Sequence, residues 1–356
     1  MFPPARYLPW AIRFQGTVPF DLAVSGTARF DTSELARGAT SEPASVGRLR
    51  AAIARYNDVP ELEAISALGT SHAIWLAYAT LLSPGDEVLI ESPAYEPLLS
   101  TALGIGAVVT RFERAASEKF ALDPARIAAA MTARTRLVVV TNLHNPSGAR
   151  THDDLLRELA KICEARGAHL LVDEVYAPFD AFTDADGVWR GSARKLAKNV
   201  IAIASLTKCY GLGMDRIGWM LGPEDVIARA ANTTLMSCGA LPLAHAQLGL
   251  IAFGSIDNLA RRSRDLLAGQ RERVERWFAT RTDVIWSAPT SGLFGLAIST
   301  RFDDLLPRVE RAATREGVLV VPGVFFEMPN AFRLAWSIDR TRLDEALARL
   351  ARALDD

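Results

Sequence analysis

From about residue 61 to residue 222, short β-branched runs alternate with patterns typical of amphipathic helices. Parallel neighbouring strands need a crossover connection, and that connection is most often a helix. The alternation therefore predicts βα units that build a mainly parallel sheet covered by helices, which is the α/β fold class. The candidate strands are residues 87–91, 107–112, 136–141, 169–173, 200–204 and 217–221, and residues 151–166 are the clearest surface helix.

The pattern changes after residue 222. Long helical patterns come first, and a charged amphipathic stretch at 257–281 leads into the last part of the chain. That part mixes candidate strands (292–299, 318–321, 332–336) with candidate helices (303–316, 340–354). Because single cores rarely grow beyond roughly 250 to 300 residues, we expect two domains. We predict a large domain at 45–255, a smaller α+β domain at 256–356, and an N-terminal segment at 1–44 that joins the small domain.

Charge and cysteine content exclude several classes of protein. With 40 Lys and Arg against 41 Asp and Glu, the net charge is −1, which gives no drive toward nucleic acid or an anionic membrane. Cys163, Cys209 and Cys238 lack the paired spacing of disulfides or thiolate metal sites, so we predict no metal site and a reducing compartment. No apolar run reaches the length of a signal peptide or of a membrane span. The expectation is a soluble cytoplasmic protein.

Lysine is rare in this sequence, and one lysine has an unusual position. Only five of the 40 basic residues are lysines, and four of them, Lys119, Lys161, Lys195 and Lys198, lie in polar or helical stretches. Lys208 instead follows the apolar strand candidate 200–204. Burial there would lower the pKa of the amine and favour Schiff-base chemistry. Taken alone, the segment fits a lysine that leaves the strand toward solvent equally well.

Polar residues follow two further strand candidates. Asn142 to Gly148 come after strand 136–141, and the run Asp173-Glu174-Val175-Tyr176 starts at the end of strand 169–173. Ligands of open α/β sheets bind at the carboxyl ends of the strands. Each motif by itself is an ordinary turn or helix entry. In this order, with Lys208 35 residues after Asp173, they predict one site.

Seven motifs in the same order give the chain a resemblance to a known family. They are Gly69-Thr70-Ser71, Ser92-Pro93-Ala94-Tyr95, Asn145-Pro146-Ser147-Gly148, Asp173-Glu174-Val175-Tyr176, Ser205-Leu206-Thr207-Lys208, Arg216-Ile217-Gly218-Trp219 and Phe332-Arg333-Leu334. From about residue 22 to residue 333, the chain resembles the class I and II aminotransferases, pyridoxal-phosphate enzymes of fold type I. The resemblance implies a large cofactor-binding domain with a mainly parallel seven-stranded sheet, and a homodimer.

The resemblance also implies how the chain holds pyridoxal 5'-phosphate. Lys208 would form an aldimine with the cofactor aldehyde. Asp173 would be the buried anion that keeps the pyridine nitrogen protonated. Asn145 and Tyr176 fall at the family positions that donate to the phenolate oxygen, and Tyr95 resembles the aromatic residue that stacks on the ring.

The cofactor phosphate needs backbone donors and a cation. Gly69, Thr70 and Ser71 come directly before the helical pattern 72–82, and a helix N-terminus offers free N–H groups and the positive end of the helix dipole. By resemblance, Ser205 and Arg216 complete this phosphate site, with Arg216 as a bidentate donor.

The substrate side follows the family in part. Arg333 matches the arginine that clamps the α-carboxylate, and Gly26 resembles the loop glycine whose backbone approaches it. Residues 39–45 contain no tyrosine, although the family often has one there that reaches the phosphate of the neighbouring subunit. Thr27-Ala28-Arg29 also replaces the usual acidic residue or Gln and proline. We therefore assume neither the contact between subunits nor the ordinary substrate specificity.

These residues predict an aminotransferase that acts on an amino acid and, in the second half-reaction, on a keto acid acceptor. Elimination, cyclisation and decarboxylation start from the same carbanion, so a lyase, cyclase or decarboxylase of this fold is the enzymatic alternative. A ligand-sensing regulator would need an N-terminal winged helix. The 45 or so residues before the first domain helix are neither basic nor of helix-turn-helix pattern.

Overall fold

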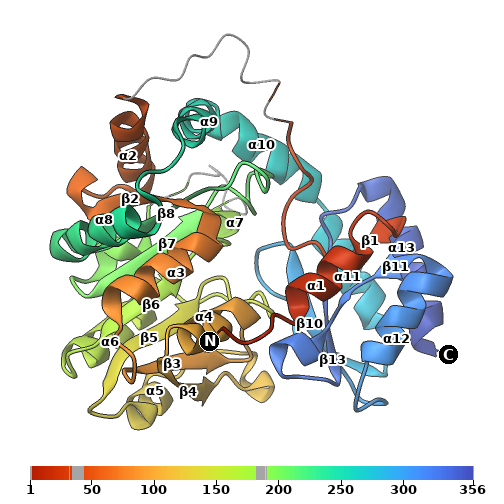
Figure 1. Ribbon diagram of the computed structural model, residues 1–356. Coiled ribbons are helices and arrows are strands. Elements are labelled where there is room, and N and C mark those ends of the chain that lie inside the picture. Colours follow the sequence, from red (N-terminus) through yellow and green to blue (C-terminus); the bar gives the residue numbers. More distant parts are fainter. Residues whose placement is uncertain (1, 32, 34–43, 182–188, 190, 356) are drawn as a thin grey trace.

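A twisted seven-stranded sheet forms the centre of the larger part of the molecule, on the left of Figure 1. The computed structural model describes residues 2–31, 33, 44–181, 189 and 191–355. The strand order is β2-β8-β7-β6-β5-β3-β4, and only β8 runs antiparallel to its neighbours. The strands are β2 (Ala64–Leu68), β3 (Glu87–Ser92), β4 (Val108–Glu113), β5 (Thr135–Thr141), β6 (His169–Asp173), β7 (Val200–Ser205) and β8 (Ile217–Leu221). The predicted mainly parallel sheet is confirmed.

Helices cover both faces of this sheet because alternate strand residues point to opposite sides. Val88 and Ile90 of β3 pack under α3, α4 and α8, whereas Leu89 packs under α5 and α6. The helices of this part are α2 (Ala44–Asn57), α3 (Gly69–Leu81), α4 (Glu96–Gly104), α5 (Pro124–Ala130), α6 (Asp153–Glu164), α7 (Pro178–Ala181), α8 (Glu224–Cys238) and α9 (Leu243–Gly254).

The smaller part, on the right of Figure 1, is built on an antiparallel sheet of order β12-β13-β10-β9. Its strands are β9 (Val284–Trp286), β10 (Phe294–Ser299), β12 (Val321–Pro322) and β13 (Ala331–Ala335). Its helices are α11 (Gln270–Ala279), α12 (Leu306–Arg311) and α13 (Arg340–Asp355), and α10 (Ile256–Leu267) leads into them. The predicted α+β character is confirmed.

The predictions did not include α1, β1 or β9, and four further differences from the predicted elements have a physical reason. Strand β2 was not predicted, because its residues AISAL are mostly small. The stretch 257–281 is two helices, α10 and α11, separated near Gly269, whose φ is +73°. The expected strand 318–321 is divided between β11 (Val318–Leu319) and β12. The expected helix 303–316 begins at Leu306, and its last five residues form a π-helical turn.

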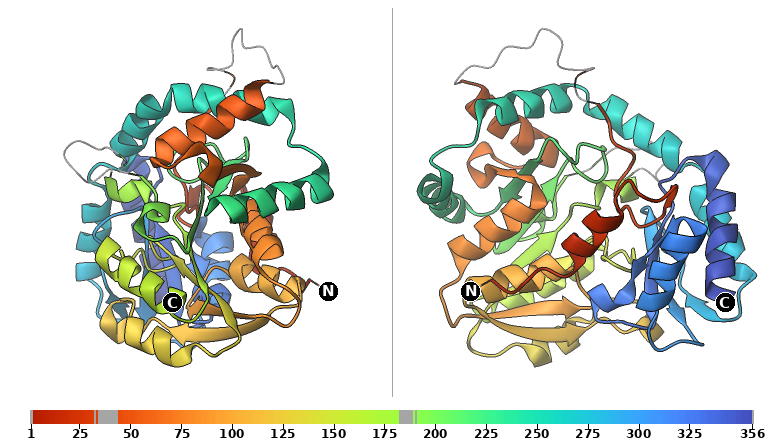
Figure 2. Two further views of the ribbon diagram at one scale, coloured as in Figure 1. Left: turned by 90° about the vertical axis from the view of Figure 1, so that its left-hand side faces the viewer. Right: turned by 45° about the vertical axis from the view of Figure 1, so that its right-hand side comes forward.

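The N-terminal segment packs against the smaller part. Helix α1 (Tyr7–Phe14) buries Tyr7, Trp10 and Phe14 in the same core as α12 and α13, and strand β1 (Phe20–Asp21) adds Phe20 to it. Strand β1 pairs in parallel with β11, Phe20 opposite Val318. The right-hand view of Figure 2 shows α1, in red, beside the smaller part, in blue. The boundaries 1–44, 45–255 and 256–356 stay a prediction.

Candidate active site

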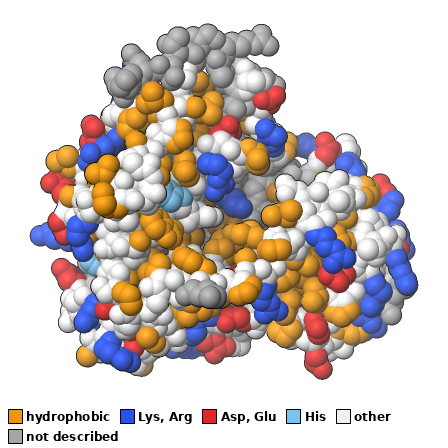
Figure 3. Space-filling model, in the orientation of Figure 1, with side chains coloured by type: hydrophobic (Ala, Val, Ile, Leu, Met, Phe, Trp, Pro, Cys, Tyr) orange, Lys and Arg blue, Asp and Glu red, His pale blue; other side chains and the backbone are white. Residues whose placement is uncertain are grey.

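A cavity of about 660 Å³ lies at the carboxyl ends of β5 and β6 and extends to the N-terminal segment. Figure 3 shows the hollow between the two parts of the molecule, with basic and hydrophobic side chains around it. Nine of the residues predicted to bind cofactor or substrate line this cavity: Gly26, Thr70, Ser71, Tyr95, Asn145, Asp173, Tyr176, Lys208 and Arg216. The other three do not line it, but each lies against a residue that does: Gly69 against Arg216, Ser205 against Thr70 and Arg333 against Asn145.

Lys208 faces the cavity, and Leu206 and Cys209, which lie close to it in the sequence, are fully buried. Burial, followed by the positive charges of Arg333 and Arg216, lowers the pKa of Lys208 to about 8. Its Nζ donates a hydrogen bond to Oγ of Ser25 at 3.1 Å. The amine therefore lies in an enclosed, positively charged setting where a neutral fraction exists near neutral pH.

Asp173 ends β6 and is 3% exposed. Its Oδ1 accepts a hydrogen bond from the backbone N–H of Val175 at 3.1 Å. Burial raises the pKa of Asp173 to about 7, and the charge of Lys208 opposes that shift. A carboxylate in this position would be stabilised by a cation within hydrogen-bonding distance, because that cation would replace the lost solvation.

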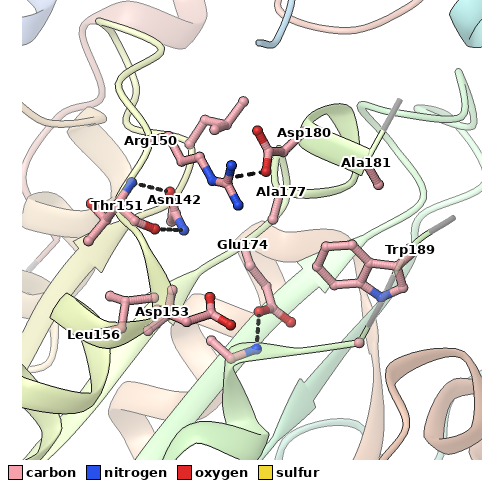
Figure 4. Close-up of a pocket in the computed structure, with 14 residues that line it drawn as sticks. Asn142, Arg150, Thr151, Asp153, Leu156, Glu174, Ala177, Asp180, Ala181 and Trp189 are labelled. Atoms are coloured by element: carbon pink, nitrogen blue, oxygen red, sulfur yellow. Dashed lines mark hydrogen bonds and ion pairs between the residues drawn. The ribbon is translucent and has the colours of Figure 1, made fainter. Parts of the chain in front are cut away.

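The neighbouring Glu174, the first residue after β6, does not line this cavity. It lines a second cavity of about 190 Å³, together with the ion pair of Arg150 and Asp180, whose atoms Nε and Oδ2 are 2.9 Å apart. Figure 4 shows this cavity, where Asn142 and Thr151 also exchange two hydrogen bonds of 3.0 Å. None of the predicted cofactor or substrate residues lines it. The carboxylates of Asp173 and Glu174 thus line two different cavities.

The start of α3 lies against the side chain of Arg216. Gly69 has φ +74°, and a Cβ at this position would overlap the guanidinium of Arg216. Thr70 Oγ1 donates to Ser205 Oγ at 2.8 Å, and Ser205 shares a 2.7 Å hydrogen bond with Thr207. The result is a helix N-terminus with two hydroxyls and one guanidinium beside it, a set of donors suited to a dianion.

Arg333 lies on β13 and is 1% exposed. Nη1 donates to Oδ1 of Asn145 at 2.7 Å, and Nη2 donates to the carbonyl of Ala23 at 3.0 Å and to the hydroxyl of Tyr7 at 3.2 Å. Among the described residues, Nε has no hydrogen-bond partner, and the nearby carboxylate of Asp21 interacts with the guanidinium electrostatically without a hydrogen bond to it. A buried guanidinium without a hydrogen-bonded carboxylate is costly, so it is suited to receive an anionic ligand.

The aromatic residues around the cavity contact one another at their edges. Tyr95 and Tyr7 meet edge to face, with ring centroids 6.1 Å apart. Tyr176 meets Phe294 in the same way at 4.9 Å, and burial raises the pKa of the Tyr176 phenol. Both tyrosines that the sequence analysis selected therefore keep a protonated hydroxyl at the cavity.

Two residues of the site were not assigned a role from the sequence. Ser25 was visible as the residue before Gly26, but nothing in the sequence connected it to Lys208. No sequence pattern connected Tyr7 to the site, because it lies in a short helix far along the chain from every motif. The sequence analysis found no tyrosine at residues 39–45 that could reach the phosphate of a neighbouring subunit. Residues 39–43 of that stretch lie outside the described residues.

Comparison with known proteins places this site in a family. A model of the family described as aminotransferase class I and II matches residues 37–350. Capreomycidine synthase of Streptomyces vinaceus is 31% identical over 86% of this chain and 78% of that protein. The aspartate/prephenate aminotransferase of Thermus thermophilus is 29% identical over 96% of this chain and 93% of its own length.

A solved structure agrees with the sequence comparisons. The structure of Thermus thermophilus aspartate aminotransferase with maleate superposes with a TM-score of 0.86 at 25% identity, covering 99% of this chain and 97% of that one. The chain therefore belongs to the aminotransferase class I and II family and is a fold type I enzyme with pyridoxal 5'-phosphate as its cofactor.

Proposed function

We propose that this aminotransferase holds pyridoxal phosphate between Asp173 and the N-terminus of α3, with Lys208 as its reactive amine. The cavity residues fit the group. The N-terminus of α3 and Arg216 suit the phosphate. Arg216 can lie beside this N-terminus only because Gly69 has no Cβ, which would overlap its guanidinium. Asp173 is a buried carboxylate suited to a protonated ring nitrogen, and Asn145 and Tyr176 offer donors for the phenolate oxygen.

When bound, the cofactor supplies a carbon that bonds the substrate nitrogen and a ring that withdraws electrons from the substrate Cα. The protein's part is to hold the substrate and move a proton. We assign the proton transfer to Nζ of Lys208, whose pKa of about 8 lets it accept a proton from Cα and release it again. Asp173 would supply a negative charge at the end of β6 once a cation lies beside it, because that cation offsets the burial that raises its pKa to about 7.

The substrate carboxylate is assigned to Arg333. Its Nε is buried without a partner, while Asn145 and Tyr7 hold the two Nη atoms in place. A guanidinium fixed in this way has little freedom left to lose when it binds a carboxylate. Gly26 approaches the same region with its backbone and lines the cavity. Fixing the carboxylate orients the Cα–H bond toward Lys208.

The observation that carries the proposal is one cavity lined by the amine of Lys208, the carboxylate of Asp173 and Asn145, whose side chain accepts a hydrogen bond from Arg333, the guanidinium with an unpartnered Nε. We expect an amino acid as donor and a keto acid as acceptor. The test is a panel of amino acids mixed with the cofactor-loaded enzyme in a stopped-flow spectrometer. Lasting conversion to the amine form of the cofactor, with release of the matching keto acid, supports transfer.

The alternative is a lyase, cyclase or decarboxylase reaction in the same site. One solved structure with the same fold is named a PLP-dependent cyclase, which is a specific reason to include cyclisation. In the same panel, release of ammonia, of carbon dioxide or of a cyclised amino acid without the amine form of the cofactor would contradict transfer. An active Lys208→Ala variant would contradict every version that uses this lysine.

We also propose a homodimer in the cytoplasm. Support for the dimer comes from exposed hydrophobic side chains on one side of the large part, Leu235 and Met236 on α8 and Leu243 on α9. Exposed apolar residues that lie together often mark an interface. Among the described residues, no helix is long and apolar enough to cross a membrane. Sedimentation of the cofactor-loaded enzyme tests the dimer directly.

A further inference from the structure

Ser25 provides the hydrogen-bond acceptor for the reactive lysine. The ammonium or amine of Lys208 donates to Oγ of Ser25 at 3.1 Å, and this is the one side-chain hydrogen bond that Nζ forms within the described part of the chain. Ser25 is 8% exposed and lines the same cavity. A buried amine with one acceptor has its direction set by that acceptor.

The same hydroxyl also interacts with Tyr176. A hydrogen bond from Ser25 lowers the pKa of the Tyr176 phenol and opposes the larger effect of burial. A serine hydroxyl has one O–H to donate and two lone pairs to accept with. Ser25 can therefore accept from Lys208 and donate to Tyr176 at once, so that it lies between two groups of the proposed site.

The backbone around Ser25 is held on both sides. Downstream, the N–H of Thr27 donates to the carbonyl of Lys208 at 2.9 Å, and the hydroxyl of Ser337 donates to the carbonyl of Gly26 at 2.8 Å. Upstream, Arg333 donates to the carbonyl of Ala23 at 3.0 Å. These contacts fix the position of Oγ relative to Lys208 without help from Ser25 itself.

We propose that Ser25 is a positioning residue for Lys208: its Oγ accepts from Nζ while its O–H points to Tyr176, so that the free amine is held in one orientation during proton transfer. The inference rests on the proposed role of Lys208 as the proton carrier. This role explains why a polar residue, Ser25, occupies a buried position in a segment that lines the cavity. A purely structural serine would not alter the ionisation of Lys208.

The experiment compares Ser25→Ala with Ser25→Thr, which keeps the hydroxyl, and with Ser337→Ala. Ser337→Ala removes a hydroxyl that follows β13 and contacts the segment of Ser25 at the Gly26 carbonyl, without touching Lys208. The first measurement labels the enzyme, saturated with pyridoxamine phosphate to keep the lysine free, with an acylating reagent across a pH series. Mass spectrometry follows Lys208, and the four other lysines are internal references.

Loss of the acceptor disfavours the charged amine, so we expect the labelling midpoint of Lys208 in Ser25→Ala to move down by roughly one pH unit. We expect kcat to fall roughly tenfold with KM nearly unchanged, because Arg333 still holds the carboxylate. Ser25→Thr and Ser337→Ala should keep the parent midpoint.

Two results would overturn the inference. One is a parent midpoint and parent kcat in Ser25→Ala. The other is the same loss in Ser337→Ala, which would assign the effect to the loop and not to the hydroxyl. Lys208→Ala in the same assay separates this inference from the proposed function. If Lys208→Ala is inactive while Ser25→Ala behaves as the parent, only the role of Ser25 fails.

Discussion

Tyr7 and Arg333, 326 residues apart in the sequence, share a hydrogen bond of 3.2 Å in which Nη2 of Arg333 donates to the phenol oxygen. The Tyr7 hydroxyl keeps its own proton free, and a carboxylate bound to Arg333 is the natural acceptor for it. We expect Tyr7→Phe to raise KM for the amino donor about five- to tenfold, from one lost hydrogen bond, with kcat unchanged. Steady-state kinetics check this, and an unchanged KM would contradict it.

Arg333→Lys should harm substrate binding more severely. Lysine offers a point charge and cannot reproduce the fork that contacts Asn145 and the carbonyl of Ala23 while Nε stays available. We expect KM for the amino donor to rise about 100-fold, on the order of 3 kcal/mol for a charged bidentate contact. The cofactor Kd, measured by fluorescence titration, should stay at the parent value, because Arg333 lies outside the proposed phosphate site. A parallel loss of cofactor would refute this division of roles.

Gly69→Ala tests the contact between α3 and Arg216. The new Cβ would overlap the guanidinium, and φ of +74° adds strain of about 1 kcal/mol or more. We expect the Kd of pyridoxal phosphate to rise more than about tenfold as Arg216 is displaced, which corresponds to one lost charged hydrogen bond. Gly167→Ala is the matched control, since Gly167 has φ +69° and open space around its Cβ position. If both variants bind cofactor equally well, the overlap has no role in binding.

Lys208→Met should stabilise the cofactor-free protein in a pH-dependent way. Burial lowers the pKa of Lys208 from 10.5 to about 8. Below pH 8 the amine is charged in both the folded and the unfolded chain, so the folded state bears the full cost of burying that charge. Between pH 8 and 10.5 the folded chain is already neutral, so the cost declines, and above 10.5 it is gone.

We therefore expect the variant to gain up to roughly 3 kcal/mol in free energy of unfolding below pH 8, at about 1.4 kcal/mol per pKa unit, and to lose this gain as the pH rises to 10.5. Denaturant unfolding at several pH values measures it. Lys161→Met, on the exposed face of α6, is the matched control for the loss of a lysine outside the cavity. A gain for Lys208→Met that is constant with pH would mean that packing, and not charge, is its cause.

The central sheet could be predicted because its strands are buried on both sides. Runs such as residues 136–141 are apolar without alternation, which is typical of parallel strands between two helix layers. The polar residues that follow them could be grouped into one site for a related reason, since the carboxyl ends of parallel strands meet at one edge. Lys208 and Asp173 were found in this way before any contact was known.

The remaining features depend on contacts that a local pattern does not contain. Val318, Val320 and Val321 are all apolar and fully buried, so their pattern contains no break at the point where the run divides between two sheets. Tyr7 and Ser25 reach the site only because α1 and the segment after β1 pack against the smaller part. Such contacts connect residues far apart in the chain, and hydrophobic periodicity reports only on near neighbours.

The pairing of Phe20 with Val318 has a consequence for synthesis. A ribosome delivers the N-terminal end first, and domains generally fold as they emerge. The large sheet ends at β8, near residue 221, and is complete long before β11 has been made. Strand β1 and helix α1 must wait for nearly the whole chain before their partners exist. A segment that is translated before the large sheet is therefore among the last to dock, and with it come Tyr7 and Ser25.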